Sequence, residues 1–291
     1  MATMPAASFG GARVVLLESR LAAETAAMVR RLGGEPVCAP SLAELDVDAD
    51  AAINTFIDRL SAARGSVVVF LTGAAVLRLF AAADRLGRDA ALVEGLTGAA
   101  IVARGPKPAG ALARRGVSAS RTVPEPFTTT EVLLTLETMP AEGREVTVVH
   151  YGERNEPIVS NLEARGARVH ELMLYEWRLP ADVSALSQAI DALISGEIPV
   201  LAFTSQVQVR HLLEVAGPGR REALLDALNA SVLVGAVGPT CAAACTSAGI
   251  RAVVSPERPK LFPLLQVLAT AHTARGTRAI DRTVSHPKEC L

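Results

Sequence analysis

The feature that most constrains this chain is an internal repeat with a step of 133 residues (238 − 105). Three pairs of landmarks keep this step, namely Gly105 with Gly238, Phe70 with Phe203, and Gly116 with Gly249. The stretch from Phe70 to Gly116 therefore matches the second copy without an insertion or a deletion. A repeat of this length indicates a duplicated domain, so both copies are expected to hold the same elements in the same order.

Short apolar runs alternate with segments of helical periodicity in both copies. In the first copy we predict strands at 13–17, 35–39, 66–70 and 99–103, with helices ending near 32 and at 50–63, 73–86, 89–96, 106–115 and 128–137. In the second copy we predict strands at 146–150, 167–177, 200–203, 231–236 and 251–254. The predicted helices of this copy are 184–195, 239–247 and 260–271, together with one that ends near 165 and two that start at 205 and 220. Alternating strands and helices predict an α/β fold with two parallel sheets, each covered by helices.

Composition agrees with two soluble domains and excludes several classes of protein. The chain has 291 residues, of which 50% are apolar, and its net charge is −1, so no general attraction to nucleic acid or to an anionic membrane is expected. Its four cysteines show no CxxC spacing, and no secretory leader or membrane span is predicted, which favours a cytoplasmic protein. Residues 275–291 lack apolar periodicity and are predicted to be a disordered tail.

The repeated Gly-Pro turns, Gly105-Pro106 and Gly238-Pro239, join a strand to a helix. Proline suits the first helical turn, and glycine lets a ligand approach the backbone closely. The free N–H groups at such a helix start attract anions, and open α/β sheets bind ligands at the carboxyl ends of their strands. Two interpretations stay open: an anion-binding turn, or a turn that only ends a strand and starts a helix.

Hydroxyl side chains follow the matched strands, with Thr72 in the first copy and Thr204 and Ser205 in the second. Each is expected to cap the next helix, and contact with a ligand is a second possibility. His150 ends another predicted strand and is a weaker candidate for ligand contact.

Nothing in the sequence calls for a metal or a nucleotide cofactor. No GxGxxG or GxxxxGK[ST] motif occurs. Cys241 and Cys245 share one helix face, but no histidine or carboxylate has the usual zinc spacing, so packing is favoured over metal binding.

The order of these motifs resembles the uroporphyrinogen-III synthase family over residues 13–272. The resemblance depends on the strand–helix–glycine order near 14–33, the strands ending in Phe and a hydroxyl at 67–72 and 200–205, the Gly-Pro turns, and 169–175 leading into Arg178-Leu179-Pro180. Residues 103–107 and 149–153 are similar to a divergent bacterial subgroup of synthase-like proteins.

The resemblance implies two flavodoxin-like domains joined by a two-stranded β-ladder, with the first strand and helix exchanged into the second copy. One domain would comprise 1–40 and 176–274, and the other 41–175. The ladder would form from 35–40 and 168–178.

The implied activity is that of a cyclising lyase of porphyrin and heme biosynthesis, acting as a cytoplasmic monomer without a cofactor. Its substrate would be hydroxymethylbilane, a linear tetrapyrrole, bound in an interdomain cleft. Loss of water and a spiro intermediate would invert ring D and give uroporphyrinogen III. The alternative is a non-catalytic tetrapyrrole-binding or regulatory module on the same fold.

The resemblance also implies roles for individual residues. Tyr175 would be the proton donor or a carboxylate ligand, unless it only packs in the ladder. The substrate would meet the two Gly-Pro turns and nearby side chains, namely Gly105, Arg104, Lys107 and Thr72 from one copy and Gly238, Pro239, Thr204, Ser205 and either Thr240 or Cys241 from the other. Many members carry Thr-Arg after the first strand, whereas this chain has Leu17-Glu18.

Overall fold

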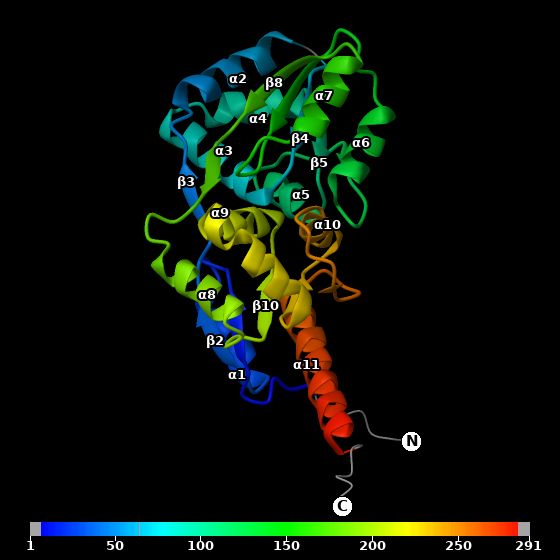
Figure 1. Cartoon of the computed structure of the whole chain (residues 1–291). Helices are drawn as coiled ribbons and strands as arrows, with labels where there is room; N and C mark the ends of the chain where they lie inside the picture. The colour runs from blue at the N-terminus through cyan, green and yellow to red at the C-terminus, as the bar shows by residue number, and fades with distance from the viewer. Residues whose placement is uncertain (1–6, 64, 285–291) are drawn as a thin grey trace, which may run out of the picture. The chain divides into compact units, whose positions relative to one another are not determined.

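The computed structural model describes residues 7–63 and 65–284, which form two units (Figure 1). Unit 1 combines the chain up to Ala43 with the chain from Arg178 onward, and unit 2 comprises Glu44–Trp177. The resemblance implied divisions after residues 40 and 175.

Unit 1 contains a five-stranded parallel sheet in the order β12-β11-β10-β1-β2. Its strands are β1 (Arg13–Leu16), β2 (Glu35–Cys38), β10 (Val200–Phe203), β11 (Leu233–Ala236) and β12 (Val253–Val254). Its helices are α1 (Ala22–Arg31), α8 (Ser184–Ile194), α9 (Gln206–Ala230), α10 (Pro239–Ser247) and α11 (Leu261–Val284). β10 and β11 are buried at every position, as expected for strands covered on both faces.

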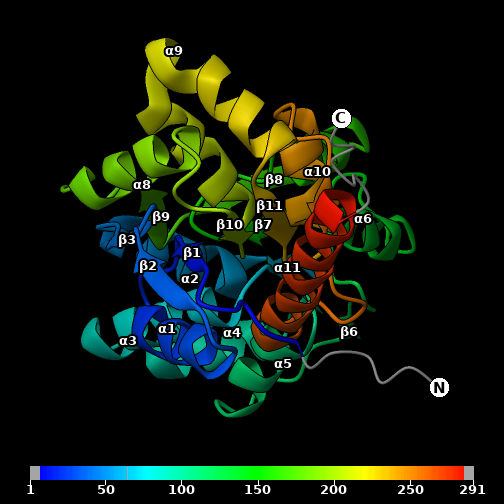
Figure 2. The same ribbon diagram turned by 60° about the horizontal axis from the view of Figure 1, so that its bottom comes forward.

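Alternate side chains of this sheet enter two separate cores. Val15 and Phe203 pack with α8, α9 and α10, whereas Val14 and Ala202 pack with α1 and α11. Figure 2 shows α8 and α9 on one side of the strands and α1 and α11 on the other. Successive side chains of a strand point to opposite faces of the sheet, so neighbouring residues pack against different helices.

Unit 2 contains a matching parallel sheet in the order β6-β5-β4-β7-β8. Its strands are β4 (Val67–Phe70), β5 (Ala100–Ala103), β6 (Arg121–Thr122), β7 (Glu145–Val149) and β8 (Arg168–Leu172). Its helices are α2 (Asp50–Ala62), α3 (Gly73–Arg85), α4 (Asp89–Thr97), α5 (Pro106–Ala113), α6 (Thr129–Glu137) and α7 (Glu156–Ala164).

The duplication is visible strand by strand. β4, β5 and β2 begin 133 residues before β10, β11 and β8 (200 − 67, 233 − 100 and 168 − 35). The two sheets have the same order once these pairs are matched, but β1 and β2 belong to the sheet of the second copy. This exchange is the one that the resemblance implied.

The predicted ladder was partly wrong. A small antiparallel sheet does exist, but it pairs β3 (Ala43–Asp46) with β9 (Tyr175–Arg178). Residues 35–38 and 168–172 are instead strands of the two parallel sheets. Each segment pairs with one parallel strand of its own unit, which satisfies the backbone groups on that side.

Two further predictions concern helices. Residues 206–230 form α9, whose backbone is non-helical at Gly217, so the two predicted helices meet at that break. The predicted disordered tail is wrong for 275–284, because α11 continues to Val284, and the remaining residues 285–291 lie outside the described part. A helix started by the packed residues Leu264 and Leu268 can continue through strong helix formers such as alanine and arginine. Within the described residues, no helix combines the length and apolar character needed to cross a membrane.

Candidate functional site

The carboxyl-terminal edge of the unit 2 sheet gathers polar side chains from three neighbouring strands. Thr72 follows β4, Arg104 follows β5 and Tyr151 follows β7. The chain leaves β4 toward β5 on one side and returns as β7 on the other, so this edge includes a topological switch point. Open α/β sheets bind their ligands at such a point.

Thr72 and Tyr175 meet at this edge. The Thr72 hydroxyl lies 3.2 Å from the Tyr175 hydroxyl, and it also accepts the Ala75 N–H at 3.1 Å as the N-cap of α3. Tyr175 is 2% exposed, and the guanidinium of Arg78 lies 4.4 Å from its ring centroid. Burial raises the pKa of Tyr175 above its usual value, although the Thr72 bond opposes this, so the phenol keeps its proton at neutral pH.

Arg104 is a half-buried cation with no carboxylate partner among the described residues. Its guanidinium lies 4.6 Å from the ring centroid of Tyr151. Burial lowers the pKa of Arg104, and the neighbouring Tyr151 and Tyr175 oppose this change. An arginine stays protonated in such a setting, so the group is a desolvated positive charge that can form two hydrogen bonds to one carboxylate.

Tyr151 is a member of this edge that the sequence did not single out. Its ring packs 5.3 Å from that of Trp177, and its hydroxyl accepts a 3.4 Å hydrogen bond from Asn155 Nδ2. Burial raises the pKa of Tyr151, with Arg104 opposing. The preceding His150 is only 1% exposed, so it supports the edge from beneath its surface.

The first Gly-Pro turn completes the unit 2 edge. Gly105 has a φ of 87°, and a Cβ at this position would lie 2.9 Å from the Phe127 ring, so the turn requires glycine. Pro106 begins α5, and Lys107 follows it as an exposed cation.

The equivalent edge of unit 1 has a different chemistry. Glu18 follows β1, and its Oε1 accepts hydrogen bonds from the Thr204 hydroxyl and, at 3.3 Å, from Gln208 Nε2. The Thr204 N–H donates to Gln208 Oε1 at 2.8 Å. Both polar groups of Thr204 therefore have partners within unit 1.

The other candidates in unit 1 serve mainly to build helix starts. Ser205 caps α9 by accepting the Val207 N–H at 3.3 Å, and Pro239 is the first residue of α10 after its N-cap, Gly238. Thr240 is exposed, whereas Cys241 is 3% exposed and packs in the core of unit 1. The helical phase thus leaves Thr240 as the accessible side chain after this turn.

No group of three or more metal-ligating side chains occurs in 7–63 and 65–284.

The predicted site residues are divided between the two units. Thr72, Arg104, Gly105, Lys107 and Tyr175 lie in unit 2, and Thr204, Ser205, Gly238, Pro239, Thr240 and Cys241 lie in unit 1.

The sequence of this chain matches one protein family and two of its relatives. Residues 23–266 match the family described as uroporphyrinogen-III synthase HemD. A putative uroporphyrinogen-III synthase of Methanothermobacter thermautotrophicus is 28% identical over 253 residues, covering 86% of this chain and 94% of that protein. The uncharacterised protein YjjA of Bacillus subtilis is 27% identical over 265 residues, covering 89% and 95%.

A solved structure agrees with the sequence match. The crystal structure of a mutant uroporphyrinogen III synthase from Thermus thermophilus has a TM-score of 0.71 and 27% identity, covering 94% of this chain and all of that one. The family match spans most of the chain and both of its units. The chain belongs to the uroporphyrinogen-III synthase family.

Proposed function

We propose that this protein is a uroporphyrinogen-III synthase, which converts hydroxymethylbilane to uroporphyrinogen III and water. The observation that carries the proposal is the unit 2 edge, where the Thr72 hydroxyl and the Arg104 guanidinium follow adjacent strands and the protonated phenol of Tyr175 lies 3.2 Å from the Thr72 hydroxyl. The substrate is a linear tetrapyrrole with eight carboxylates, which suits an edge of cations and hydrogen-bond donors. The family match over 23–266 supports the same reaction.

The chemistry needs positioning and one proton donor more than it needs a nucleophile. Protonation of the terminal hydroxyl lets it leave as water, and the electron pair of the pyrrole nitrogen forms the electrophilic methylene-pyrrolenine. The substituted carbon of ring D then attacks the methylene carbon to give the spiro intermediate, which fragments and closes again with ring D inverted. Unassisted closure gives the type I isomer, so the protein must select the conformation that leads to type III.

Tyr175 is our proton donor. Its pKa is raised by burial, so the phenol holds a proton at neutral pH, and its bond to Thr72 fixes the hydroxyl. The proton can return at the final closure, because the unsubstituted carbon of ring D loses its hydrogen as a proton when it bonds to the methylene carbon released by fragmentation. No proton is then gained or lost by the protein over the turnover.

Arg104 is our main carboxylate ligand, with exposed Lys107 and the turn at Gly105 as further contacts. A desolvated guanidinium that has no carboxylate partner among the described residues gains most from a bidentate carboxylate. In unit 1, we propose that exposed Thr240 and the backbone at Gly238-Pro239 also contact the substrate, while Thr204 contributes through its network. We further propose that the enzyme acts as a monomer in the cytoplasm and needs no cofactor.

A non-catalytic tetrapyrrole-binding module is the second candidate, and Glu18 favours it. This carboxylate engages Thr204, and it lies where many members of the family carry a base. This departure from the family pattern is the observation that favours loss of the reaction on an otherwise unchanged fold.

The ratio of isomers separates the two candidates. Purified protein is mixed with freshly made hydroxymethylbilane, and the products are oxidised and resolved by chromatography. A synthase gives predominantly the type III isomer, and heat-denatured protein gives type I. Type I alone from folded protein, at the rate without protein, would contradict the synthase and favour the binding module.

A further inference from the structure

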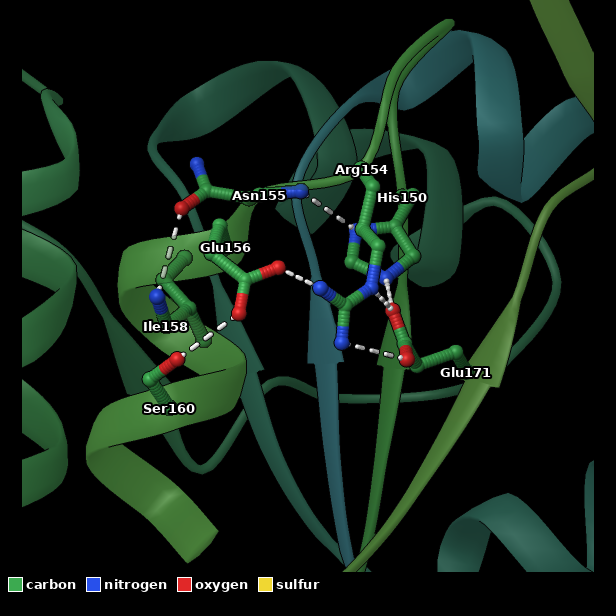
Figure 3. Close-up of polar contacts among 7 residues, drawn as sticks. All are labelled: His150, Arg154, Asn155, Glu156, Ile158, Ser160 and Glu171. Atoms are coloured by element: carbon green, nitrogen blue, oxygen red, sulfur yellow. Dashed lines mark hydrogen bonds and ion pairs between the residues drawn. The ribbon is translucent and has the colours of Figure 1, made fainter. Parts of the chain in front are cut away.

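His150 has a fixed hydrogen-bond arrangement beneath the unit 2 edge (Figure 3). Its side chain is 1% exposed, its Nε2 lies 2.8 Å from Glu171 Oε2, and its Nδ1 accepts the Asn155 N–H at 3.2 Å. A nitrogen that accepts a backbone N–H carries no proton of its own. The imidazole is therefore the neutral Nε2–H tautomer, which donates to Glu171.

Glu171 is held from a second direction by Arg154. The Arg154 guanidinium donates from Nε and Nη2 to the two oxygens of Glu171, at 2.7 and 2.9 Å, and it also pairs with Glu156. Figure 3 shows His150 and Arg154 reaching the same carboxylate from the two ends of the 150–154 turn. The Glu171 side chain on β8 therefore holds both ends of this turn by hydrogen bonds.

The 150–154 turn and the adjoining Asn155 make the contacts that position Tyr151 at the unit 2 edge. Asn155 donates from Nδ2 to Thr129 Oγ1 at 2.9 Å and to the Tyr151 hydroxyl at 3.4 Å. Gly152, with a φ of 42°, lies against the Trp177 ring so closely that a Cβ would be 2.3 Å from it, and its carbonyl accepts the Trp177 N–H at 2.7 Å. The position of Tyr151 therefore follows from the position of the turn.

We propose that His150, Glu171 and Arg154 form a positioning unit, which fixes Tyr151 and thereby the Arg104 guanidinium for one carboxylate of the substrate. None of the three is a ligand of that carboxylate. They act through Asn155 and Tyr151, whose ring faces Arg104 at 4.6 Å. The kinetic part of this inference rests on the proposed function, whereas its structural part does not.

The chain contains a matched control on the same two strands. His170 of β8 bonds Glu145 of β7 at 2.5 Å, and Arg168 also pairs with Glu145. This second His–Glu–Arg set lies at the opposite end of β7, and no loop of the candidate edge depends on it. Equal substitutions in the two sets separate a positioning effect from a general loss of charge pairs.

The first readout needs no ligand. Trp177 is the sole tryptophan of the chain and touches both Gly152 and Tyr151, so its fluorescence reports the position of the turn. We expect His150→Ala and Arg154→Ala to shift its emission to longer wavelength and to increase quenching by acrylamide. His170→Ala and Arg168→Ala should leave both unchanged. Arg154 is 44% exposed, so its variant tests the inference even if His150→Ala does not fold.

The second readout is the kinetics of type III formation. We expect KM for hydroxymethylbilane to rise about tenfold in His150→Ala and Arg154→Ala with kcat within twofold, because binding geometry changes while Tyr175 stays in place. Unchanged fluorescence, equal effects in both sets, or altered fluorescence with an unchanged KM would each overturn the proposal. If the wild-type protein forms no type III isomer, the proposed function fails, and the fluorescence contrast alone decides whether the unit positions Tyr151.

Discussion

The two sheet edges descend from one sequence but now have opposite chemistry. Thr72 and Ser205 are 133 residues apart (205 − 72) and cap equivalent helices, so this function is unchanged. Tyr151 corresponds to Glu18 (151 − 18), and Arg104 corresponds to Val237 (237 − 104). Both copies thus keep the helix cap. The side chains beside it differ, because unit 2 has the aromatic Tyr151 and the cation Arg104 where unit 1 has the acid Glu18 and the apolar Val237.

This difference supports our proposal that the chemistry lies in unit 2. A carboxylate-rich ligand gains from Arg104 and from the phenol of Tyr175, and it gains nothing comparable from Glu18. Substitutions at the two edges test this asymmetry.

The largest effect is expected for Tyr175→Phe. Removal of the phenol hydroxyl should lower kcat for type III formation by about a hundredfold, in the range typical of a lost general acid, with KM little changed. Because burial raises the pKa of Tyr175, the wild-type rate should not fall as pH rises until about pH 10 or above. A variant within twofold of wild type would show that Tyr175 only packs in the ladder.

Arg104→Gln should weaken substrate binding. Loss of a charge-assisted bidentate contact of about 2 kcal/mol corresponds to an increase in KM of about thirtyfold. The matched control is Arg114→Gln, which removes an exposed arginine at the far end of α5 and should leave KM unchanged. Equal KM values for the two variants would remove the carboxylate site from unit 2.

The two N-caps offer a matched pair. Thr72→Ala and Ser205→Ala should each lower the free energy of unfolding by about 1 kcal/mol, because each removes one helix cap. Thr72→Ala should also lower kcat severalfold, since Tyr175 loses its partner, whereas Ser205→Ala should change kcat less. Urea denaturation and initial rates measure both quantities, and a larger loss of kcat in Ser205→Ala would reverse the asymmetry.

The smallest effect concerns pH. Burial lowers the pKa of His150, although Glu171 opposes this, and the other groups that face it are Arg154 and the Asn155 N–H. A folded-state pKa below the unfolded value means that the unfolded chain binds more protons as pH falls below about 6.5, so stability falls with it. The urea midpoint of wild type should fall between pH 7 and 5 more steeply than that of His150→Gln. Parallel pH profiles would contradict this assignment.

Much of the fold followed from local patterns, because β4, β5, β10 and β11 are continuous apolar runs that end in recognisable turns. β3 gave no such signal, since Ala43–Asp46 is a short, partly exposed strand whose pairing with β9 is not local. The ladder of 35–40 with 168–178 was implied by the resemblance, and only residues 175–178 of it lie in the observed antiparallel sheet.

Thr72 adjoins a turn and was predictable as a helix cap, whereas Arg104 was a candidate only through the resemblance, and the contact of either residue with a ligand stays a prediction. Tyr151 was missed because its place at the edge depends on contacts with Trp177 and Arg104, which lie on other segments of the chain. The choice between Thr240 and Cys241 could not be made from motif alignment. It needed the phase of α10, which buries Cys241 in the core of unit 1.

The most direct test of the divergence between the two edges is the initial rate of type III formation by Glu18→Gln. Glutamine keeps an oxygen that can accept from Thr204, so only the negative charge is lost. We predict a kcat within threefold of wild type and a KM that is equal or lower, because the acid does not take part in the reaction. Loss of type III formation in a folded Glu18→Gln protein would show that the unit 1 edge carries the chemistry and would contradict our assignment to unit 2.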